Sequence, residues 1–233
     1  MCFRLPAGAI LGVMVALASP AQATDTFAQF VQSAANARIF TYTNVNSGGF
    51  TAKLGTIAAG DGVLIADLGA LVSPTAVTVN LVGTATALPT VGADIRQLFS
   101  GSISFTLLAP QFGMSGWSTN ALKVTFTDAI LLAAPGGYAP TLQSDTGSTI
   151  SYETDFADLT GLTDKDFSLS FSGASVPLSM AGSRLPDFQI SGSGTFAAVM
   201  ALPEPGNWGL MLGGFAAVGM VLRARRRVPV SFA

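Results

Sequence analysis

Apolar and polar residues alternate along the chain in a series of short segments. A period of two places apolar side chains on one face of a β-strand and polar side chains on the other. The segments with this pattern span residues 40–43, 77–81, 102–107, 122–127, 150–152 and 167–171, and the last runs from Phe188 to Met200. Serine and threonine fill many of the polar positions. We therefore expect strands that bury one face and expose the other.

Segments that favour tight turns separate these strands. They lie at residues 46–49, 60–62, 135–137 and 182–183 and are rich in glycine, which tolerates the backbone conformations of turns. Roughly eight to ten short strands with one apolar face each are typical of antiparallel sheets around one core. The predicted fold class is therefore all-β, an antiparallel β-sandwich or jelly-roll-like secreted domain.

The segment 24–37 has a different period. Its apolar residues recur at helical spacing, as Phe27, Phe30, Val31 and Ala34. An aspartate near its beginning suits a helix N-terminus. We expect a short helix here.

The first 23 residues have the features of a secretory signal peptide. Arg4 supplies the positive charge, residues 7–18 are apolar, and the small residues Ala21 and Ala23 form a cleavage site for signal peptidase. We expect cleavage after Ala23, which leaves a secreted β-rich domain at 24–201. The alternative is an uncleaved membrane anchor, although the apolar run is shorter than the roughly 20 residues that span a bilayer.

The segment 202–233 combines four features in a fixed order. A stiff Pro203-Glu204-Pro205 motif precedes Trp208, and the uncharged apolar stretch that follows predicts a transmembrane helix over about 208–222. An arginine cluster closes it, formed by Arg223, Arg225, Arg226 and Arg227. Arginines of this kind stay on the cytoplasmic side of a membrane. The expected orientation therefore places the domain outside, as after cleavage of a signal peptide.

This tail resembles the PEP-CTERM sorting signal of Gram-negative bacteria. The match covers about the last 30 residues, and it departs from the family pattern at Gly209, where that subgroup has alanine, and in the extension 228–233. The resemblance implies processing at the Pro-Glu-Pro motif by an exosortase, a membrane-embedded cysteine transpeptidase. It also implies transient anchoring with the domain in the periplasm, and then a place at the cell surface or in extracellular, exopolysaccharide-rich biofilm material.

Composition narrows the possible functions of the middle domain. Charged residues make up 10% of the 233 residues, against about 25% in average soluble domains. Residues 24–202 contain 6 basic and 12 acidic residues, which disfavours nucleic acid as a partner. The chain has no histidine, and its one cysteine, Cys2, lies in the predicted signal peptide. Histidine-based catalysis, disulfides and thiolate metal sites are thereby excluded from the mature chain.

One aromatic segment is a candidate ligand contact. Residues 111–117 end in Trp117, the one tryptophan between the two targeting segments. An exposed aromatic loop could stack on a sugar ring. The alternative is a half-buried loop anchor.

An acidic stretch offers a second, weaker candidate site. It contains Asp155, Asp158, Asp164 and Asp166. Carboxylate oxygens suit Ca²⁺, but the spacing does not match an EF-hand loop, and a solvated loop is the simpler interpretation. Paired carboxylates could also serve glycoside hydrolysis. The triplet Asp145-Thr146-Gly147 matches that of aspartic proteases, which need two such carboxylates. The sequence contains no second triplet, and a turn before the strand at Ile150 is the simpler interpretation.

These observations favour a non-enzymatic exported protein of the cell surface or extracellular matrix, without a cofactor. A carbohydrate-binding or adhesive module is the first alternative. A secreted hydrolase that uses Asp/Glu pairs is the second.

Overall fold

Antiparallel strands make up the described part of the chain. The structure is a computed structural model that describes residues 24–33, 37–44, 52–56, 60–200 and Phe215. The predicted signal peptide, the predicted turn at 46–49 and, apart from Phe215, the sorting segment 202–233 lie outside these residues. The strands are β1 (Asp25–Gln32), β2 (Phe40–Asn44), β3 (Ala52–Thr56), β4 (Gly60–Ala66), β5 (Thr75–Ala85), β6 (Thr90–Val91), β7 (Ile95–Gly113), β8 (Gly116–Ala133), β9 (Thr141–Gln143), β10 (Thr149–Glu153), β11 (Leu162–Ser172) and β12 (Phe188–Met200).

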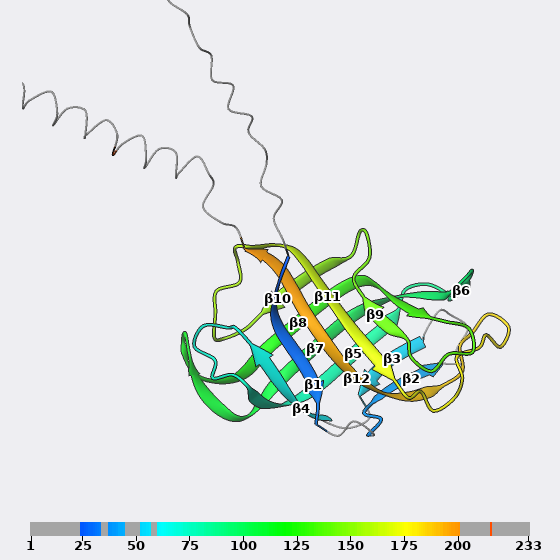
Figure 1. Ribbon diagram of the computed structural model, residues 1–233, viewed down its shortest axis with the longest axis horizontal. Helices are drawn as coiled ribbons and strands as arrows, with labels where there is room; N and C mark the ends of the chain where they lie inside the picture. The colour runs from blue at the N-terminus through cyan, green and yellow to red at the C-terminus, as the bar shows by residue number, and fades with distance from the viewer. Residues whose placement is uncertain (1–23, 34–36, 45–51, 57–59, 201–214, 216–233) are drawn as a thin grey trace, which may run out of the picture.

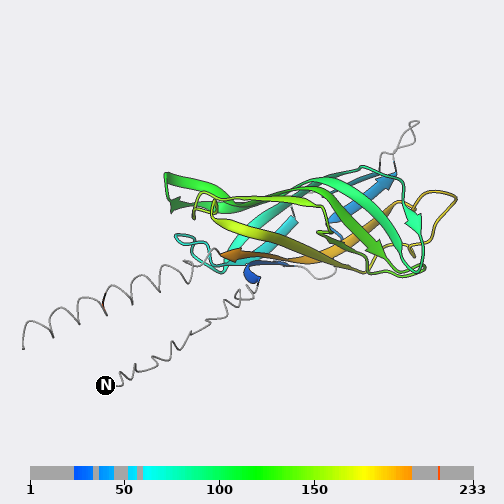
Figure 2. The same ribbon diagram turned by 90° about the horizontal axis from the view of Figure 1, so that it is seen from above.

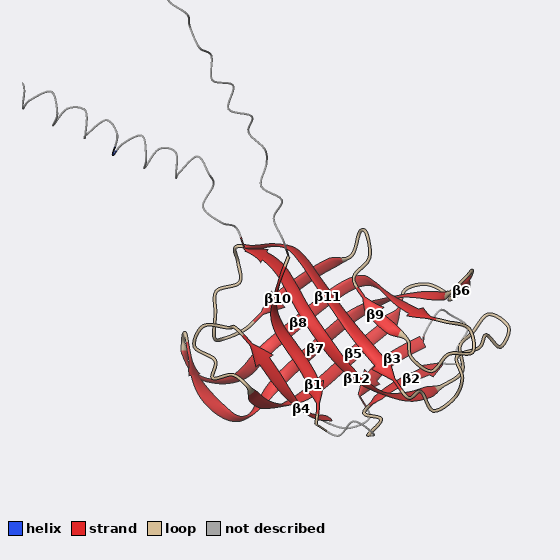
Figure 3. Ribbon diagram, in the orientation of Figure 1, coloured by secondary structure: helices blue, strands red, loops and turns tan. Residues whose placement is uncertain are grey.

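The alternating segments of the sequence form strands with one buried face, as predicted. In β5, Val77, Val79 and Leu81 are buried, while Thr78 and Asn80 between them face outward. Figure 3 shows that strands and the loops between them account for the described fold between β1 and β12. The all-β class and the antiparallel pairing are therefore confirmed.

The strands close into one eight-stranded barrel rather than the predicted sandwich of two sheets. Around the barrel the order is β12, β1, β4, β5, β7, β8, β9 and β11, and β11 pairs with β12 again. Two long-range pairings, β1 with β12 and β5 with β7, make this closure. Alternation along single strands does not encode such pairings, so it is equally compatible with a sandwich.

Three positions of the barrel are shared by pairs of short strands. β2 also pairs with β12, and β3 also pairs with β5, so these two strands continue the positions of β1 and β4 (Figure 1). β10 pairs with the part of β8 that precedes its pairing with β9. The long strands β5, β7, β8, β11 and β12 therefore form the frame that the short strands complete.

The predicted helix at 24–37 is wrong, because residues 25–32 form strand β1. A β-bulge between Thr26 and Ala28 shifts the register against β12, and Phe27 and Ala28 are consequently both buried. The bulge interrupts the alternation, so Phe27, Phe30 and Val31 imitate helical spacing. Val31 is about half exposed, as the outward position of a strand requires.

The predicted turn at 60–62 is also wrong, because these residues begin β4. Gly62 pairs with Gln32 of β1 and with Val77 of β5. A Cβ atom at this position would lie 2.0 Å from Cε2 of Phe30. The glycine therefore makes room for a core aromatic ring rather than for a chain reversal. The predicted turns at 135–137 and 182–183 are confirmed.

Aromatic side chains fill the inside of the barrel. Phe105 lies 5.2 Å from Phe30 and 5.4 Å from Phe196 between ring centroids, and all three are buried. Tyr42 stacks on Phe188 at 4.9 Å. An eight-stranded barrel is just wide enough for side chains to fill, so this interior is a packed core.

The two ends of the barrel carry different segments. At one end, here called the terminal end, β1 begins and β12 ends, and Asp25 pairs with Ala198. The same end carries the loop 67–74, the β7–β8 hairpin and the loop 154–161, and Figure 2 shows the hairpin and the loop 67–74 projecting there. The opposite, distal end carries β6, the turn at 135–137 and the loop 173–187.

Candidate functional site

The strand ends lie close, along the chain, to both predicted processing sites. β1 begins two residues after Ala23, and β12 ends three residues before Pro203. The cleavage residues Ala21 and Ala23, the motif residues Pro203, Glu204, Pro205 and Trp208, and the four arginines lie outside the described residues. Because the start of β1 pairs with the end of β12, the barrel strands that lie next to the two predicted processing sites in the sequence begin and end at the terminal end.

The candidate aromatic segment lies at the tip of the β7–β8 hairpin, at the same end. Trp117 is 75% exposed, Phe112 66% and Met114 57%. The rings of Phe112 and Trp117 meet edge to face at 6.1 Å. We call these three side chains the apolar tip. Trp117 is exposed, as predicted, and is not a half-buried anchor. The predicted loop is wrong, because residues 111–113 and 116–117 pair as strands β7 and β8.

The loop between β10 and β11 holds this hairpin in place. The backbone N–H of Met114 donates a hydrogen bond to the carbonyl of Asp155 at 2.8 Å, and the Ser118 hydroxyl donates to the Asp155 carboxylate. A Cβ atom on Gly113 would lie 2.3 Å from the same carbonyl oxygen. Glycine is therefore required for this close approach.

The two aspartates of this loop have partners in the loop and the hairpin. Asp155 accepts the hydrogen bond from Ser118, and Asp158 accepts two from Thr160, from its N–H at 3.0 Å and from its hydroxyl at 2.7 Å. These bonds, the backbone one foremost, lower the pKa of the Asp158 carboxyl, because they favour its charged form. The pattern is that of a capped, solvated loop.

The other two aspartates of the acidic stretch lie on β11. Asp164 has a positive φ of 44° within a β-bulge between Thr163 and Asp166. Asp166 accepts a hydrogen bond from the Ser144 hydroxyl. Among the described residues, no three histidine, cysteine, aspartate or glutamate side chains gather as a metal site. The fold thus provides no converging set of calcium ligands in the part of the chain that the structure describes.

The triplet at Asp145 forms a turn between β9 and β10. The Asp145 carboxylate accepts a hydrogen bond from the N–H of Thr146 at 2.8 Å. The backbone carbonyl of Asp145 accepts one from the N–H of Ser148 at 2.9 Å. Arg96 lies 3.4 Å from the same carboxylate. The turn interpretation is therefore confirmed.

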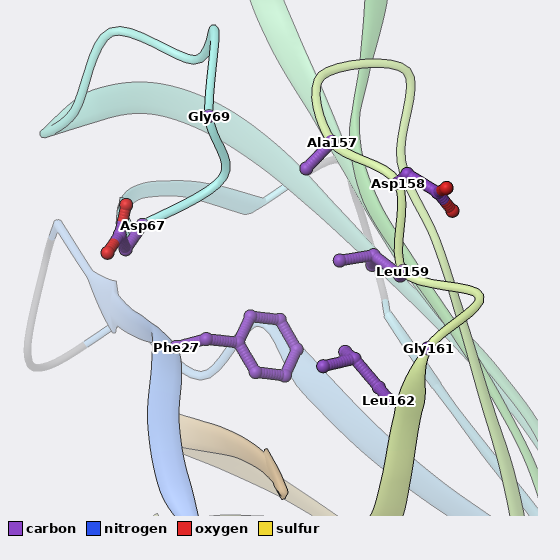
Figure 4. Close-up of a pocket in the computed structure, with 8 residues that line it drawn as sticks. All are labelled: Phe27, Asp67, Gly69, Ala157, Asp158, Leu159, Gly161 and Leu162. Carbon is purple, nitrogen blue, oxygen red and sulfur yellow. The ribbon is translucent and has the colours of Figure 1, made fainter. Parts of the chain in front are cut away.

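A pocket of about 370 Å³ lies at the terminal end beside the start of β1. Its walls come from three segments, at Phe27, at 67–69 and at 157–162. Figure 4 shows Phe27, Leu159 and Leu162 pointing toward one another, whereas the Asp158 carboxylate points away from them. No pattern in the sequence indicated this pocket, because its residues are far apart along the chain and Phe27 lies on a strand predicted as a helix.

Hydroxyl groups line the outside of the long strands. Thr78 of β5 pairs with Thr106 of β7, and Ser102 of β7 pairs with Thr125 of β8. Thr106 is exposed, and the other three are partly exposed. The outer surface of these strands is thus neutral and rich in hydrogen-bonding groups.

No helix among the described residues is long and apolar enough to cross a membrane. Comparison with family models, with curated proteins and with solved structures finds no match to this chain.

Proposed function

We propose that this chain is an exported, non-enzymatic protein of the cell surface or extracellular matrix. Signal peptidase removes residues 1–23, and an exosortase processes the tail at Pro203-Glu204-Pro205. Before processing, the apolar segment at 208–222 and the arginines hold the barrel at the periplasmic face of the inner membrane. Afterwards the barrel resides at the surface or in exopolysaccharide.

The fit of the folded unit between the two processing sites is the observation that carries this proposal. Every strand of the described residues lies between Asp25 and Met200, so cleavage after Ala23 and at the Pro-Glu-Pro motif removes none of these strands. β1 is paired on both sides, with β4 and with β12. The barrel therefore survives both cuts as a complete unit.

The surface chemistry of the barrel supports a matrix environment. Its outward serine and threonine pairs offer neutral donors and acceptors to a hydrated polysaccharide. The chain contains no histidine, and the mature chain contains no cysteine. Histidine is the most frequent general acid or base, and cysteine is a common nucleophile, so a structural role suits this composition better than catalysis.

The test is the mass of the mature protein made in a Gram-negative host that contains an exosortase. Glu204→Ala changes the centre of the motif, and we expect it to leave the tail attached. Glu153→Ala is the matched control, since the chain has no further glutamate and Glu153 forms an exposed ion pair with Lys123. This control should mature like the unaltered chain.

Mass spectrometry of both termini gives the answer directly. The proposal expects an N-terminus at Thr24 and a C-terminus within or next to the motif, and it expects the intact tail in a host without exosortase. Identical C-termini in the two hosts, or in the Glu204→Ala and unaltered chains, would refute the sorting claim.

A further inference from the structure

The apolar tip is an unusual feature for the exposed end of a barrel. Its three side chains are large and more than half exposed, and residues 106–120 contain no charged residue. A cluster of exposed large apolar groups marks an interaction site more often than scattered ones do. Two further exposed apolar residues, Val72 and Leu108, lie near the base of the hairpin.

The hairpin presents the tip in a fixed position. Met114 is bonded to the carbonyl of Asp155, and Gln111 accepts the N–H of Val72 at 2.9 Å. These bonds tie the hairpin to the loops on both sides of it. Little conformational entropy therefore remains to be lost when the tip meets a partner.

The length of the chain beyond β12 limits what the tip can reach. Trp208, where the apolar segment begins, lies eight positions after Met200, and an extended chain over that separation spans at most about 29 Å. β12 ends at the terminal end, where the hairpin also projects. A barrel anchored by this segment therefore keeps its terminal end, with the tip, close to the bilayer.

We propose that the apolar tip, formed by Phe112, Met114 and Trp117, inserts into the membrane interface while the barrel is anchored by its C-terminal segment. This inference rests on the proposed function, because the anchored state precedes processing. The contact orients the barrel end-on and limits the distance between the Pro-Glu-Pro motif and the bilayer that holds the exosortase.

The chemistry of the tip matches a lipid interface better than a sugar. Tryptophan and other amphipathic rings are enriched at membrane interfaces, and phenylalanine with tryptophan forms the inserted face of many interfacial segments. Asp67, Asp155 and Asp158 at the same end carry negative charge. They are repelled by an anionic surface, so the contact is shallow and confined to the uncharged hairpin.

The experiment uses tryptophan fluorescence of the chain with its tail intact, produced without exosortase. The protein is reconstituted into vesicles of phosphatidylethanolamine and phosphatidylglycerol, and acyl chains brominated near the headgroup serve as quenchers. The chain contains two tryptophans, so Trp208→Phe leaves Trp117 as the single reporter. We expect its emission to shift to shorter wavelength and its intensity to fall by roughly half, as for an interfacial indole.

The matched control places the reporter at the distal end. Tyr138 is 51% exposed beside the turn at 135–137, so the variant Trp117→Phe, Trp208→Phe, Tyr138→Trp carries a single tryptophan there. We expect no quenching of this reporter. Circular dichroism verifies that both variants keep the strand spectrum.

The possible outcomes separate the inference from the proposed function. Flotation of the chain with the vesicles without quenching of Trp117 overturns the inference and leaves the anchor intact. Failure of the chain to float overturns both. Equal quenching of the two reporters overturns the end-on orientation, and a Trp117 shift with soluble alginate but not with vesicles assigns the tip to a polysaccharide instead.

Discussion

The terminal and distal ends of the barrel differ although one core connects them. At the terminal end, exposed apolar residues gather on an uncharged hairpin, as the apolar tip. At the distal end, the exposed Val91 lies on β6, which pairs with the segment of β7 that carries Arg96. Phe112 and Trp117 lie on the last residues of β7 and the first residues of β8, and Val91 lies on β6. The strand ends and the turns between them therefore decide what each end can contact.

The interior shows a parallel difference between the two halves. Around Phe105 in the terminal half, the core is aromatic, and the hydroxyl of Tyr152 donates to the backbone carbonyls of Asp166 and Ala197. The distal half is aromatic too, with Tyr42 stacked on Phe188, but its buried tyrosine hydroxyl donates to a side chain, Gln97 Oε1, at 2.9 Å. The two halves therefore differ in the acceptor of their buried tyrosine hydroxyl, which is backbone in one half and a side chain in the other.

Removal of the central ring from the terminal half should have the largest effect. Phe105→Ala leaves a cavity between Phe30 and Phe196 and should lower the free energy of unfolding by about 3–5 kcal/mol. Equilibrium urea unfolding of the mature chain measures this loss. The exposed Val82 is the control, since Val82→Thr should change stability by less than about 0.5 kcal/mol. Equal losses in the two variants would contradict the packed interior.

The close approach at the hairpin should be the next most sensitive point. Gly113→Ala places a Cβ atom against the Asp155 carbonyl and should destabilise the chain by about 1–3 kcal/mol. Gly92 at the distal end is the matched control, because no heavy atom lies within 4 Å of its built Cβ. Thermal unfolding of both variants compares the two ends. A Gly92→Ala effect as large as that of Gly113→Ala would remove the contrast.

Alkaline pH should reveal the buried tyrosine of the distal half. Burial raises the pKa of Tyr42 to about 12, against about 10 for an unperturbed tyrosine. Folding thus favours the neutral phenol. Its contribution to the free energy of unfolding is complete below pH 10 and is lost as the pH rises through 12. Tyr42→Phe should therefore lose less stability than the unaltered chain between pH 10 and pH 12. Parallel unfolding curves at both pH values would contradict this assignment.

Two exposed ion pairs among the described residues should have the smallest effect on stability. Arg96 lies 3.4 Å from Asp145, and Lys123 lies 3.1 Å from Glu153. Double-mutant cycles at each pair should yield coupling energies of about 0–1 kcal/mol that shrink with added salt. A value well above this range at one pair alone would identify an electrostatic difference between the two regions.

Alternation along the sequence predicted β2, β5, β7, β8, β10, β11 and β12, because each has one face in the core and one face outside, but it did not predict the short strands β3, β4, β6 and β9. It also did not predict closure, since the pairing of β1 with β12 joins residues far apart in the chain. β1 was missed for a local reason, the bulge next to Phe27. Alternation also did not predict that the β7–β8 hairpin lies at the terminal end, where β1 begins and β12 ends.

The candidate site was also predictable only in part, because the sequence shows single residues but not which distant segments the fold brings together. Trp117 was identified from its isolation in the sequence, and its exposure is confirmed. The pocket at Phe27, Leu159 and Leu162 depends on three separate segments, so only the folded chain reveals it. Glu204 and the other motif residues stay predictions, because they lie outside the described residues.

The pairing of the first strand with the last has a consequence for how the chain folds. Asp25 and Ala198 are partners at opposite limits of the folded unit, so the barrel has a high contact order and closes late. Among the described strands, the closing strand β12 is the last to be synthesised. In the export route proposed above, the chain therefore crosses the membrane open, and the barrel closes only after residue 200 has emerged.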